Sequence, residues 1–314
     1  MKFGVVLVTY NRLDKLKISL DCYDKQTYLP EYVLVVNNNS TDETEKYLRE
    51  WKSKKTKYEK IVLNLPSNIG GSGGFFEGLK KSLKLDADWI WVADDDAFPK
   101  NDCFKKANEY LKDRDIKDIS AICGKVLNRG QIDLTHRRRI KNLGFFPLQT
   151  IPGKRNYNKE SFEIQLFSYV GTFINKEKMK KVGITKRDYF IYNDDSEHSY
   201  RLSKVGKIIC IPSIEIIHDG PQVLTKDGVN WKLYYSIRNV LNMIKSNWPK
   251  RYYNSYKLYV RVKYFLIIML LYKNKRQGLR ILNKAVSDAN NNIEGLDKVY
   301  RPGWKPRKGA KSNG

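Results

Sequence analysis

The chain has 314 residues and a mass of 36.8 kDa, which suits one large domain or two ordinary ones and excludes a peptide or a disulfide-stabilised miniature fold. It carries 59 Lys and Arg against 34 Asp and Glu, a formal net charge of +25, while 41% of its residues are hydrophobic. The apolar content excludes a wholly disordered chain. The charge predicts an anionic partner, which could be nucleic acid, a membrane face or a phosphorylated substrate.

The first hundred residues alternate strand and helix patterns. Apolar β-branched runs predict strands over residues 3–9, 32–36, 60–64 and 89–93. Helical spacing predicts helices over 13–26, 44–54 and 73–85, with Ser40 and Thr41 as candidate N-caps of the second helix. This order predicts a parallel sheet wound by helices, which binds ligands beyond the carboxyl ends of its strands. The loops there are rich in Asn, Asp, Gly and Ser: 9–12, 37–42, 66–74 and 94–99.

The rest of the chain changes in character. Between 125 and 220 the pattern predicts short strands over 165–173, 207–212 and 215–218 and a helix that starts near Ser196. Residues 245–314 hold 17 Lys and Arg against three acids, so about +14 of the excess charge lies there. The four cysteines, at 22, 103, 123 and 210, are scattered, which favours isolated buried thiols in a reducing compartment over zinc or disulfides.

Three consecutive carboxylates, Asp94, Asp95 and Asp96, directly follow the apolar strand 89–93. Adjacent carboxylates at the end of a buried strand repel one another and lose hydration, so a cation would compensate them. Mg²⁺ and Mn²⁺ typically bind one or two carboxylates together with substrate phosphates. Alternation along an extended segment predicts that Asp94 and Asp96 face one site while Asp95 points away. The alternative is a solvated acidic turn.

Residues 66–75 form a glycine-rich segment, PSNIGGSGGF, that leads into a predicted helix. Its backbone N–H groups, including those of Gly71 and Gly73, could approach a diphosphate. The segment lacks the Gly-Lys-Ser/Thr of a P-loop and follows the third strand, whereas a dinucleotide fingerprint follows the first. A plain tight turn is the alternative.

Four segments in chain order, each at a predicted strand end, together resemble a known family. They are residues 8–12, 35–42, 68–75 and 91–96. Over roughly residues 3–240 the chain resembles the family-2 glycosyltransferases, most closely the bacterial branch of galactofuranosyl- and rhamnosyltransferases. The resemblance implies the α/β GT-A fold, a Rossmann-like and mostly parallel sheet flanked by helices, here with a basic helical C-terminal extension.

The resemblance also implies an organisation. A GT-A catalytic domain would cover 1–240, with a nucleotide-binding half over 1–100 and an acceptor and metal half over 101–240. A basic amphipathic helical extension would follow over 241–300 and a flexible tail over 301–314. The implied activity is a metal-dependent, inverting transfer of a sugar from a UDP- or dTDP-sugar, with UDP-galactofuranose or dTDP-L-rhamnose favoured.

Site residues follow from the resemblance position by position. Asp94 resembles the first Asp of the family's DxD, near the ribose, and Asp96 the one that holds Mn²⁺ or Mg²⁺. Asn37 departs from the Asp that commonly accepts from the pyrimidine N3–H; an Asn carbonyl can accept the same bond, and uracil and thymine share that N3–H. The residues implied to contact the nucleotide-sugar are Thr9, Asn11, Arg12, Asn37, Asn68, Gly71, Gly73, Asp94 and Asp95.

The second half supplies the acceptor chemistry. Residues 190–197, FIYNDDSE, resemble the family's acidic motif before a helix. Inverting transfer needs a carboxylate that takes the acceptor hydroxyl's proton while a metal neutralises the departing diphosphate. The resemblance implies Asp195 as this base, with Asp194 as the rival. Glu197 would bind acceptor hydroxyls or would only favour the helix N-terminus electrostatically, and simple helix capping is the alternative for the whole motif.

His218 closes a predicted strand and resembles the C-terminal His that completes the metal shell in some of these enzymes. His136 and His198 lie in no such motif, and we predict that they are surface residues. Residues 234–239 resemble a helix that follows the catalytic core in this branch. Arg238 in that helix would either face a phosphate or anchor the helix.

Beyond residue 245 aromatic residues alternate with cations, so a helix there would present a mixed apolar and basic surface to an anionic membrane. A lipid-linked or growing surface-polysaccharide acceptor would be anchored on that membrane. The alternative is a helical pair packed on the catalytic domain with a solvated cationic face. The longest apolar run, 264–272, is about half a membrane span, and residues 5–8 are too short for a signal sequence.

We therefore expect a cytoplasmic enzyme, peripheral on the inner face of the cell membrane, with homo-oligomerisation left open. Two other classes compete. A basic protein that binds single-stranded nucleic acid would account for the cations and aromatics but leaves the Asp run and the glycine segment unexplained. A non-catalytic binding paralogue that keeps the GT-A fold would account for both.

Overall fold

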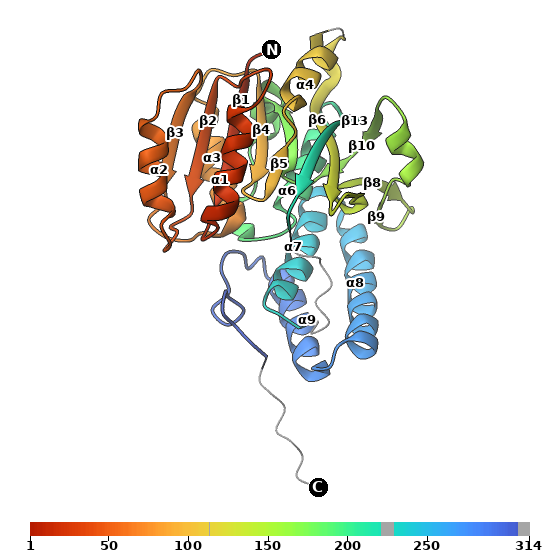
Figure 1. Cartoon of the computed structure of the whole chain (residues 1–314). Coiled ribbons are helices and arrows are strands. Elements are labelled where there is room, and N and C mark those ends of the chain that lie inside the picture. Colours follow the sequence, from red (N-terminus) through yellow and green to blue (C-terminus); the bar gives the residue numbers. More distant parts are fainter. Residues whose placement is uncertain (113, 221–228, 307–314) are drawn as a thin grey trace. The chain divides into compact units, whose positions relative to one another are not determined.

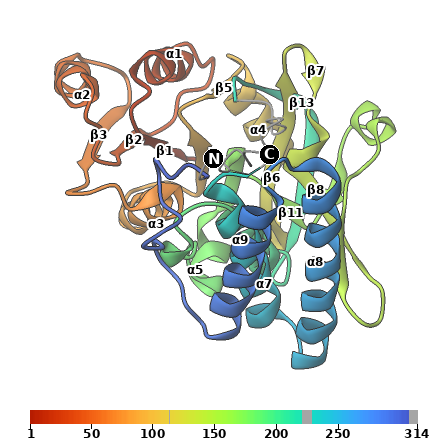
Figure 2. The same ribbon diagram turned by 90° about the horizontal axis from the view of Figure 1, so that it is seen from below.

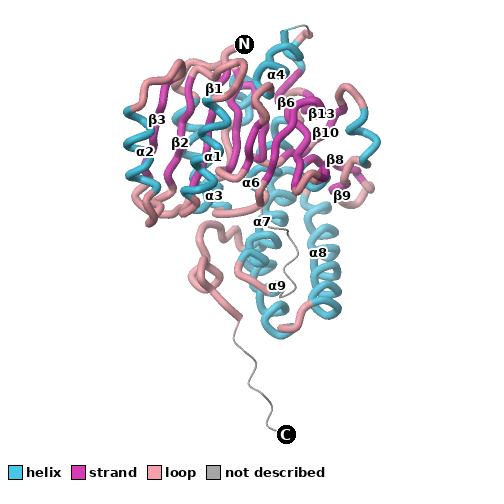
Figure 3. The backbone as a smooth tube through the Cα atoms, in the orientation of Figure 1, coloured by secondary structure: helices cyan, strands magenta, loops and turns pink. Residues whose placement is uncertain are grey.

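The computed structural model describes residues 1–112, 114–220 and 229–306, whose path is drawn in Figure 1 and Figure 3. The chain forms two compact units, and each unit consists of three separate segments of the sequence. The first unit comprises Met1–Ile140, Gln149–Arg187 and Asp195–Gly220, and the second comprises Lys141–Leu148, Asp188–Asp194 and Pro221–Gly314. The predicted boundary at residue 240 stays a prediction. Much of the predicted tail, residues 307–314, lies outside the described residues.

A ten-stranded sheet forms the centre of the first unit. Its strands are β1 (Phe3–Thr9), β2 (Tyr32–Asn37), β3 (Glu59–Asn64), β4 (Trp89–Asp94), β5 (Ala97–Pro99), β6 (Ile119–Asn128), β7 (Gln131–Ile132), β10 (Phe162–Ile164), β12 (Val170–Asn175) and β13 (Lys207–His218). The order is β10-β13-β6-β12-β4-β1-β2-β3, with β5 paired to β13 and β7 to β6. A three-stranded sheet has the order β11-β8-β9, from β8 (Arg137–Asn142), β9 (Pro147–Thr150) and β11 (Leu166–Phe167).

The half of the sheet that residues 1–100 contribute has a parallel core, as the alternating pattern predicts. Strands β4, β1, β2 and β3 pair in parallel, and so do β6 and β13. Strand β12 runs antiparallel between β4 and β6. The two short strands predicted over 207–218 are one strand, β13, with an irregular register between Ile211 and Glu215. The sheet is therefore mixed, and the predicted α/β fold class is confirmed.

Helices cover both faces of this sheet. On one face α1 (Leu13–Asp24), α2 (Thr44–Ser53) and α4 (Cys103–Lys112) pack in one core with Phe3, Val5 and Leu7 of β1. On the other face α3 (Gly70–Ser82), α5 (Lys176–Val182) and α6 (Asp194–Leu202) pack with Val6 and Val8. Figure 2 shows α1 and α2 on one side of β1–β3 and α3 on the other. Both faces of β1 are thus buried, as its unbroken apolar run requires.

Helix α2 begins at Thr44 as predicted, but its predicted cap is wrong, and so is the predicted start of α3. Helix α2 does not use Ser40 or Thr41 as its cap; Asp42 Oδ1 accepts from the Thr44 N–H at 3.1 Å instead. Helix α3 begins at Gly70 and not at residue 73, so most of the glycine run is helical. A Cβ on Gly74 would lie 2.6 Å from Val8 Cγ1, and one on Gly78 2.6 Å from Val6 Cγ1. These two glycines let α3 approach β1 closely.

The second unit contains three helices and two segments from earlier in the chain, Lys141–Leu148 and Asp188–Asp194. Helices α7 (Lys232–Asn247), α8 (Lys250–Leu271) and α9 (Lys275–Asn290) share a core that includes Tyr234, Tyr235, Leu241, Ile268 and Ala285. In the part of the chain that the structure describes, no helix is both long enough and apolar enough to span a membrane. Short 3-10 turns complete the fold: Ile116–Asp118, Leu134–His136, Lys154–Asn158 and Arg187–Tyr189.

Candidate active site

The site begins where β1 and β4 end side by side. Thr9 is the last residue of β1, and Asp95 and Asp96 form the turn between β4 and β5. Thr9 Oγ1 donates to Asp95 Oδ2 at 2.8 Å, and Arg12 Nη1 donates to Asp95 Oδ1 at 3.1 Å and to Asp96 Oδ2 at 2.7 Å. Both carboxylates are buried, at 2% and 3% exposure. The guanidinium of Arg12 therefore supplies part of the positive charge that the carboxylate run demands.

Two opposed effects set the pKa values of these carboxyl groups. Burial raises the pKa of Asp95 to about 6, although the charge of Arg12 and the hydrogen bond from Thr9 act against it. Burial would also raise the pKa of Asp96, but the interaction with His218 and the charge of Arg12 outweigh burial and lower it below its usual value. The surroundings therefore favour the ionised form of Asp96 more strongly than that of Asp95.

The prediction that Asp95 points away from the site is wrong. Asp95 faces Thr9 and Arg12 together with Asp96. Alternation of side chains requires an extended backbone, and the strand ends at Asp94, so residues 95 and 96 turn instead of alternating. Asp94 is half-buried at the end of β4, and its backbone N–H donates to the Tyr169 carbonyl at 3.2 Å.

His218 lies beside Asp96. Its Nε2 is 3.5 Å from Asp96 Oδ1, and its Nδ1 is buried with no hydrogen-bond partner among the described residues. A Cβ on Gly220 would lie 2.4 Å from the His218 ring, so glycine leaves room for the imidazole. A carboxylate and an imidazole with a free buried nitrogen suit a divalent transition ion. The residues predicted to hold the metal, Asp96 and His218, are therefore adjacent.

A second histidine joins this cluster, which the sequence did not predict. The His136 ring meets the His218 ring edge to face at 4.9 Å between centroids. His136 Nε2 is 3.3 Å from Asp133 Oδ2, and ligand atoms of Asp133, His136 and His218 all lie within 4.8 Å of one another. Burial lowers the pKa of His136 below its usual value, against the effect of Asp133. His136 is mostly covered, so the prediction of a surface residue is wrong.

The asparagines of the loops brace the site from within. Asn11, at φ 51°, bonds the Ser40 hydroxyl and the Thr41 backbone, which joins two loops. Asn37 is buried; its Nδ2 donates to Asn64 and its Oδ1 accepts from the Ser40 N–H at 3.0 Å. The oxygen predicted to meet a pyrimidine thus already accepts one protein donor. A carbonyl oxygen has a second lone pair for the base.

Asn38 also belongs to this network, although the sequence did not predict it as a site residue. It is 2% exposed, its Nδ2 donates to Asn68 Oδ1 at 3.2 Å and to the Gly70 carbonyl at 2.9 Å, and its Oδ1 accepts from the Ile69 N–H. Asn68 Oδ1 also accepts from the Gly70 N–H at 2.9 Å. Asn38 and Asn68 together fix the entry to α3. A Cβ on Gly71 would meet no atom within 4 Å. A Cβ on Gly73 would lie 2.6 Å from Cγ1 of the Ile69 side chain.

Helix α6 carries the predicted base at its first turn. Asp195 is half-buried, and its Oδ1 accepts from the Ser196 N–H at 2.5 Å and from Ser196 Oγ at 3.0 Å. Asp194, the rival, is 7% exposed and belongs to the second compact unit, whereas Asp195 belongs to the first. The Ser196 hydroxyl also accepts from Arg138 Nη2 at 2.6 Å. These hydrogen bonds use only Oδ1 of Asp195, so its Oδ2 is able to accept a proton.

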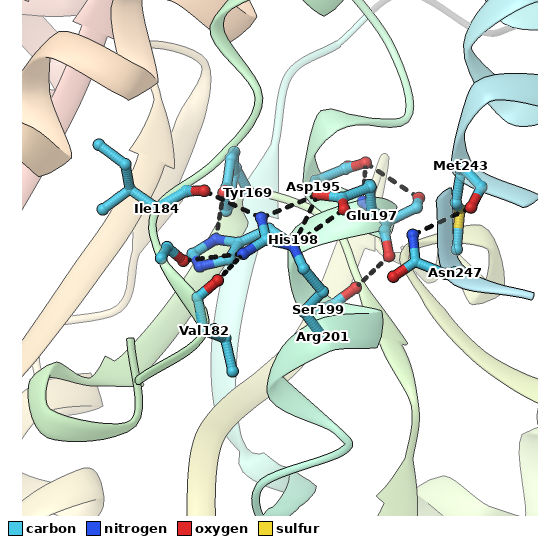
Figure 4. A network of polar contacts seen from close by, with 12 residues as sticks. Tyr169, Val182, Ile184, Asp195, Glu197, His198, Ser199, Arg201, Met243 and Asn247 are labelled. Atoms are coloured by element: carbon cyan, nitrogen blue, oxygen red, sulfur yellow. Dashed lines mark hydrogen bonds and ion pairs between the residues drawn. The ribbon is translucent and has the colours of Figure 1, made fainter. Parts of the chain in front are cut away.

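Figure 4 shows Glu197, His198 and Arg201 of α6 within a network of polar contacts. Arg201 donates to both oxygens of Glu197 at 2.8 to 3.0 Å and also to the Gly183 and Ile184 carbonyls. Glu197 is 1% exposed, so its burial disfavours the acceptor-binding role, which stays a prediction. His198 is fully buried with its Nδ1 2.7 Å from the Tyr169 hydroxyl, so the prediction of a surface residue is wrong.

The backbone immediately before α6 is strained. Phe190, Tyr192 and Asn193 all have φ between 65° and 68°, a region that side-chain-bearing residues rarely adopt. Within the second unit, Asn239 Nδ2 donates to the carbonyls of Tyr189, Ile191 and Tyr192 at 2.8 to 3.0 Å. Strained segments of this kind concentrate at functional sites.

Arg238 stands next to Asn239 and is fully buried. Its guanidinium donates to the carbonyls of Gly295 at 2.8 Å and of Tyr189 at 3.3 Å. Of the two roles considered from sequence, anchoring the helix is the one that this geometry supports. A phosphate could not reach a side chain without exposed surface.

Comparisons with known proteins agree on a family. The profile described as Glycosyl transferase family 2 matches residues 4–183. Galactofuranosyltransferase GlfT1 of Mycobacterium tuberculosis is 40% identical over 92 residues, 29% of this chain and 29% of GlfT1, so the match spans under a third of that relative's length. The dTDP-rhamnosyl transferase RfbF of Shigella flexneri is 26% identical over 262 residues, 77% of this chain and 79% of RfbF.

Solved structures share the fold. TarS 1–349 of S. aureus in complex with UDP superposes with a TM-score of 0.58 at 15% identity, covering 93% of this chain and 83% of that chain. GalNAc-T7 with UDP, GalNAc and Mn²⁺ gives a TM-score of 0.60 at 13% identity, covering 92% of this chain and 54% of that one. Both are GT-A glycosyltransferases. The likeness establishes the GT-A architecture of this chain.

Proposed function

This chain belongs to glycosyltransferase family 2, and from that premise we propose that it transfers a sugar, with inversion, from a UDP- or dTDP-sugar. UDP-galactofuranose and dTDP-L-rhamnose are the favoured donors because the two relatives named above are a galactofuranosyltransferase and a dTDP-rhamnosyl transferase. The observation that carries the proposal is the buried group of Asp95 and Asp96, held by Thr9 and Arg12 beside His218 at the carboxyl end of the sheet.

In the proposed mechanism Asp96 and His218 hold Mn²⁺ or Mg²⁺. The ion would neutralise the charge that develops on the departing diphosphate. Arg12 is about two-fifths exposed, so its guanidinium can turn from Asp95 and Asp96 towards donor phosphate oxygens. Thr9, Asn11, Asn37 and Asn68 shape the base and ribose pocket, and the start of α3 at Gly71 offers backbone N–H groups to the diphosphate.

Asp195 is the proposed general base. Its Oδ1 is occupied by Ser196, which fixes the carboxylate at the first turn of α6 and leaves Oδ2 for the acceptor hydroxyl. A base in this place takes the hydroxyl proton as the oxygen attacks the anomeric carbon. The strained residues 190–193 directly precede it and are braced by Asn239. We expect the acceptor to be a lipid-linked glycan or a growing surface polysaccharide.

The test is turnover of a panel of nucleotide-sugars. Purified chain is incubated with UDP- and dTDP-sugars, with Mn²⁺, Mg²⁺ or EDTA, and release of UDP or dTDP is measured. The proposal expects metal-dependent release from one donor class, lost in Asp96→Asn. Full activity of both Asp96→Asn and Asp195→Asn would remove these residues from the mechanism, and no release from any donor by the wild type would favour the non-catalytic paralogue.

We also propose that the second unit docks on an anionic membrane through α8. Residues 228–287 contain 13 Lys and Arg and no Asp or Glu. Within α8 one face stays uncovered: large apolar side chains recur at helical spacing and are 36% to 77% exposed. They are Leu258, Val262, Phe265, Leu266, Met269 and Leu270.

Cations border that apolar face of α8. Arg261 and Lys263 are exposed in its middle, and Lys273, Lys275 and Arg276 are exposed just beyond its C-terminal end. A helix with an apolar face and basic borders lies in the interface of an anionic bilayer, with the apolar side chains among the acyl chains. Such docking would bring a membrane-anchored acceptor to the enzyme.

A further inference from the structure

We propose that His136 and Asp133 are ligands of the divalent ion, together with His218 and Asp96, and that this shell selects Mn²⁺ over Mg²⁺. The inference deepens the proposed function, because it identifies how the metal of that site is held. No family motif in the sequence contains His136 or Asp133. The structure alone brings them to His218, across 82 to 85 positions of chain.

The spacing of the donor atoms supports one shared ion. His136 Nε2 and Asp133 Oδ2 are 3.3 Å apart, and His218 Nε2 and Asp96 Oδ1 are 3.5 Å apart. Neighbouring ligands of an octahedral ion at about 2.1 Å lie about 3 Å from each other and opposite ones about 4 Å. The ligand atoms of Asp133, His136 and His218 lie within 4.8 Å of one another, which lets these three residues share one ion. Asp96 is not in that group and adjoins it through His218, so side-chain movement has to bring its oxygen to the shared ion.

The hydrogen bonds of His136 and Asp133 to their other neighbours fit this role. His136 Nδ1 is 2.7 Å from Ser168 Oγ, which leaves Nε2 as the nitrogen aimed at Asp133. A ligating histidine commonly donates its other N–H to an oxygen that fixes the ring. Asp133 Oδ1 accepts from the Thr135 N–H at 3.0 Å and caps the Leu134–His136 turn, so Oδ2 is the oxygen that faces His136. The buried Nδ1 of His218 has no partner among the described residues.

The chemistry of this donor set decides between the two ions. Two imidazoles and two carboxylates suit first-row transition ions, whereas Mg²⁺ prefers oxygen ligands and keeps several waters. Asp96 and His218 alone would leave the choice open. With His136 and Asp133 in the shell, Mn²⁺ is the preferred ion of the two.

The test measures binding of Mn²⁺ to the full chain by electron paramagnetic resonance, where free Mn²⁺ gives the six-line signal. We expect His136→Gln and Asp133→Asn each to weaken binding at least tenfold, and Mg²⁺ to displace Mn²⁺ from the wild type only at more than a hundredfold excess. Asp219→Asn is the matched control: its carboxylate is near the site but is largely exposed and paired with Lys15. It should bind Mn²⁺ like the wild type.

A spectroscopic readout separates ligation from positioning. Electron spin echo modulation of bound Mn²⁺ should show two imidazole nitrogens in the wild type and one in His136→Gln. Equal Mn²⁺ affinity and equal nitrogen couplings in both proteins would overturn the inference, even if the variant were slower. The unfolding temperature in EDTA confirms that each variant folds. Asp133→Asn keeps the Oδ1 cap and serves if His136→Gln does not fold.

The two proposals fail in different ways. If the wild type turns over a nucleotide-sugar while His136→Gln binds Mn²⁺ unchanged, the ligand assignment is wrong and the proposed function stands. If Mn²⁺ binds through two imidazoles but no nucleotide-sugar is turned over, the proposed function is wrong and the metal site stands.

Discussion

At the residue scale, the protein itself supplies part of the charge that compensates the carboxylates after β4. The sequence places three carboxylates at a strand end and predicts a cation for them. The structure supplies Arg12, which bridges Asp95 and Asp96, and it leaves the second oxygen of Asp96 beside His218. The proposed metal would bind this second oxygen and would add the positive charge that the buried carboxylates need when the Arg12 guanidinium turns towards a diphosphate.

The proposed base gives the sharpest residue-scale prediction. Asp195→Asn keeps the size of the side chain and its acceptor oxygen for Ser196 but cannot take a proton. We expect transfer to fall by about 10² to 10⁴-fold while donor binding stays unchanged, as measured by turnover and calorimetry. Asp194→Asn is the matched control and should lose much less. A larger loss in Asp194→Asn would assign the base to Asp194.

Asn239 offers a second prediction, about positioning. Asn239→Ala removes three hydrogen bonds to the carbonyls of residues 189, 191 and 192, and we expect a loss of about 2 to 4 kcal/mol in the free energy of unfolding, from denaturant titration. Because residues 190–193 would relax, the rate of transfer should fall while the KM for the donor is kept. Asn247→Ala, on the same helix, is the control; its Nδ2 donates within α7 to the Met243 carbonyl. Loss of donor affinity in Asn239→Ala would contradict the positioning role.

Sequence patterns predicted part of this site. Thr9, Arg12, Asp95 and Asp96 lie together as the strand-end rule suggests, and His218 joins them. His136, Asp133 and Asn38 were missed because their roles come from contacts between distant segments. His198 was misplaced because its polarity suggested exposure, whereas the ring is buried with its Nδ1 paired to the Tyr169 hydroxyl.

At the element scale, glycine serves packing and not only ligand approach. In α3 a methyl group on Gly78 would lie 2.6 Å from Val6 Cγ1 and 2.9 Å from Val36 Cγ2. We expect Gly78→Ala to lower the free energy of unfolding by about 1 to 3 kcal/mol, measured by urea titration. Gly71→Ala has open space and should be neutral or stabilising by up to about 1 kcal/mol.

The variants Gly71→Ala and Gly78→Ala also test whether the start of α3 contacts the donor diphosphate. If the start of α3 approaches the diphosphate, Gly71→Ala weakens binding of UDP or dTDP without loss of stability. Gly78→Ala should leave nucleotide affinity of the folded protein unchanged. Equal nucleotide affinity in Gly71→Ala and the wild type would remove Gly71 from the binding site.

His198 in helix α6 should make the stability of the protein depend on pH. Burial holds the pKa of His198 well below 6.5, so the fold keeps the imidazole neutral while the unfolded chain protonates below pH 6.5. Stability should therefore fall as the pH drops from 7 to 5, by at most about 1.4 kcal/mol per pH unit from this residue. His198→Gln should show a shallower fall in unfolding temperature.

The wild type and His198→Gln must be compared with each other because other groups also titrate between pH 7 and 5. Asp95, with its pKa raised to about 6, contributes with the opposite sign, since its protonated form is favoured in the fold. That contribution is common to wild type and variant and cancels in the difference. Identical slopes in the two proteins would show that His198 does not titrate as its burial predicts.

Sequence patterns predicted most of the elements, and the errors have physical causes. Strand β1 was predicted over its observed residues, because an apolar β-branched run has few alternatives. The start of α3 was predicted late because glycine is a poor helix former, and only close packing on β1 explains four glycines within its first five residues. Strand β13 was split by Pro212 and Ser213, where its register is irregular.

At the scale of the whole molecule, about +14 of the net charge of +25 lies in residues 245–314, whereas the carboxylates proposed to carry the chemistry lie earlier in the sequence. The second unit combines this charge with the uncovered apolar face of α8. A purely electrostatic partner such as nucleic acid would not use that face. Docking on an anionic bilayer uses both features.

The membrane proposal predicts the behaviour of the intact chain with vesicles. Phe265→Ser with Leu266→Ser should reduce cosedimentation with vesicles of phosphatidylcholine and phosphatidylglycerol at least tenfold, with pure phosphatidylcholine bound weakly by all proteins. Ile293→Ser with Leu296→Ser is the matched control, since these residues are 47% and 49% exposed against 46% and 49%. Unchanged cosedimentation in the α8 variant, or a stable dimer that the variant dissolves, would contradict membrane docking.

Turnover of nucleotide-sugars tests the central claim most directly. Wild type and Asp96→Asn are incubated with UDP-galactofuranose and dTDP-L-rhamnose in the presence of Mn²⁺, and the released nucleoside diphosphate is quantified. We predict release from one of these donors by the wild type, reduced at least a hundredfold in Asp96→Asn and abolished by EDTA. Release of neither UDP nor dTDP from any donor of the wider panel, with or without metal, would contradict it.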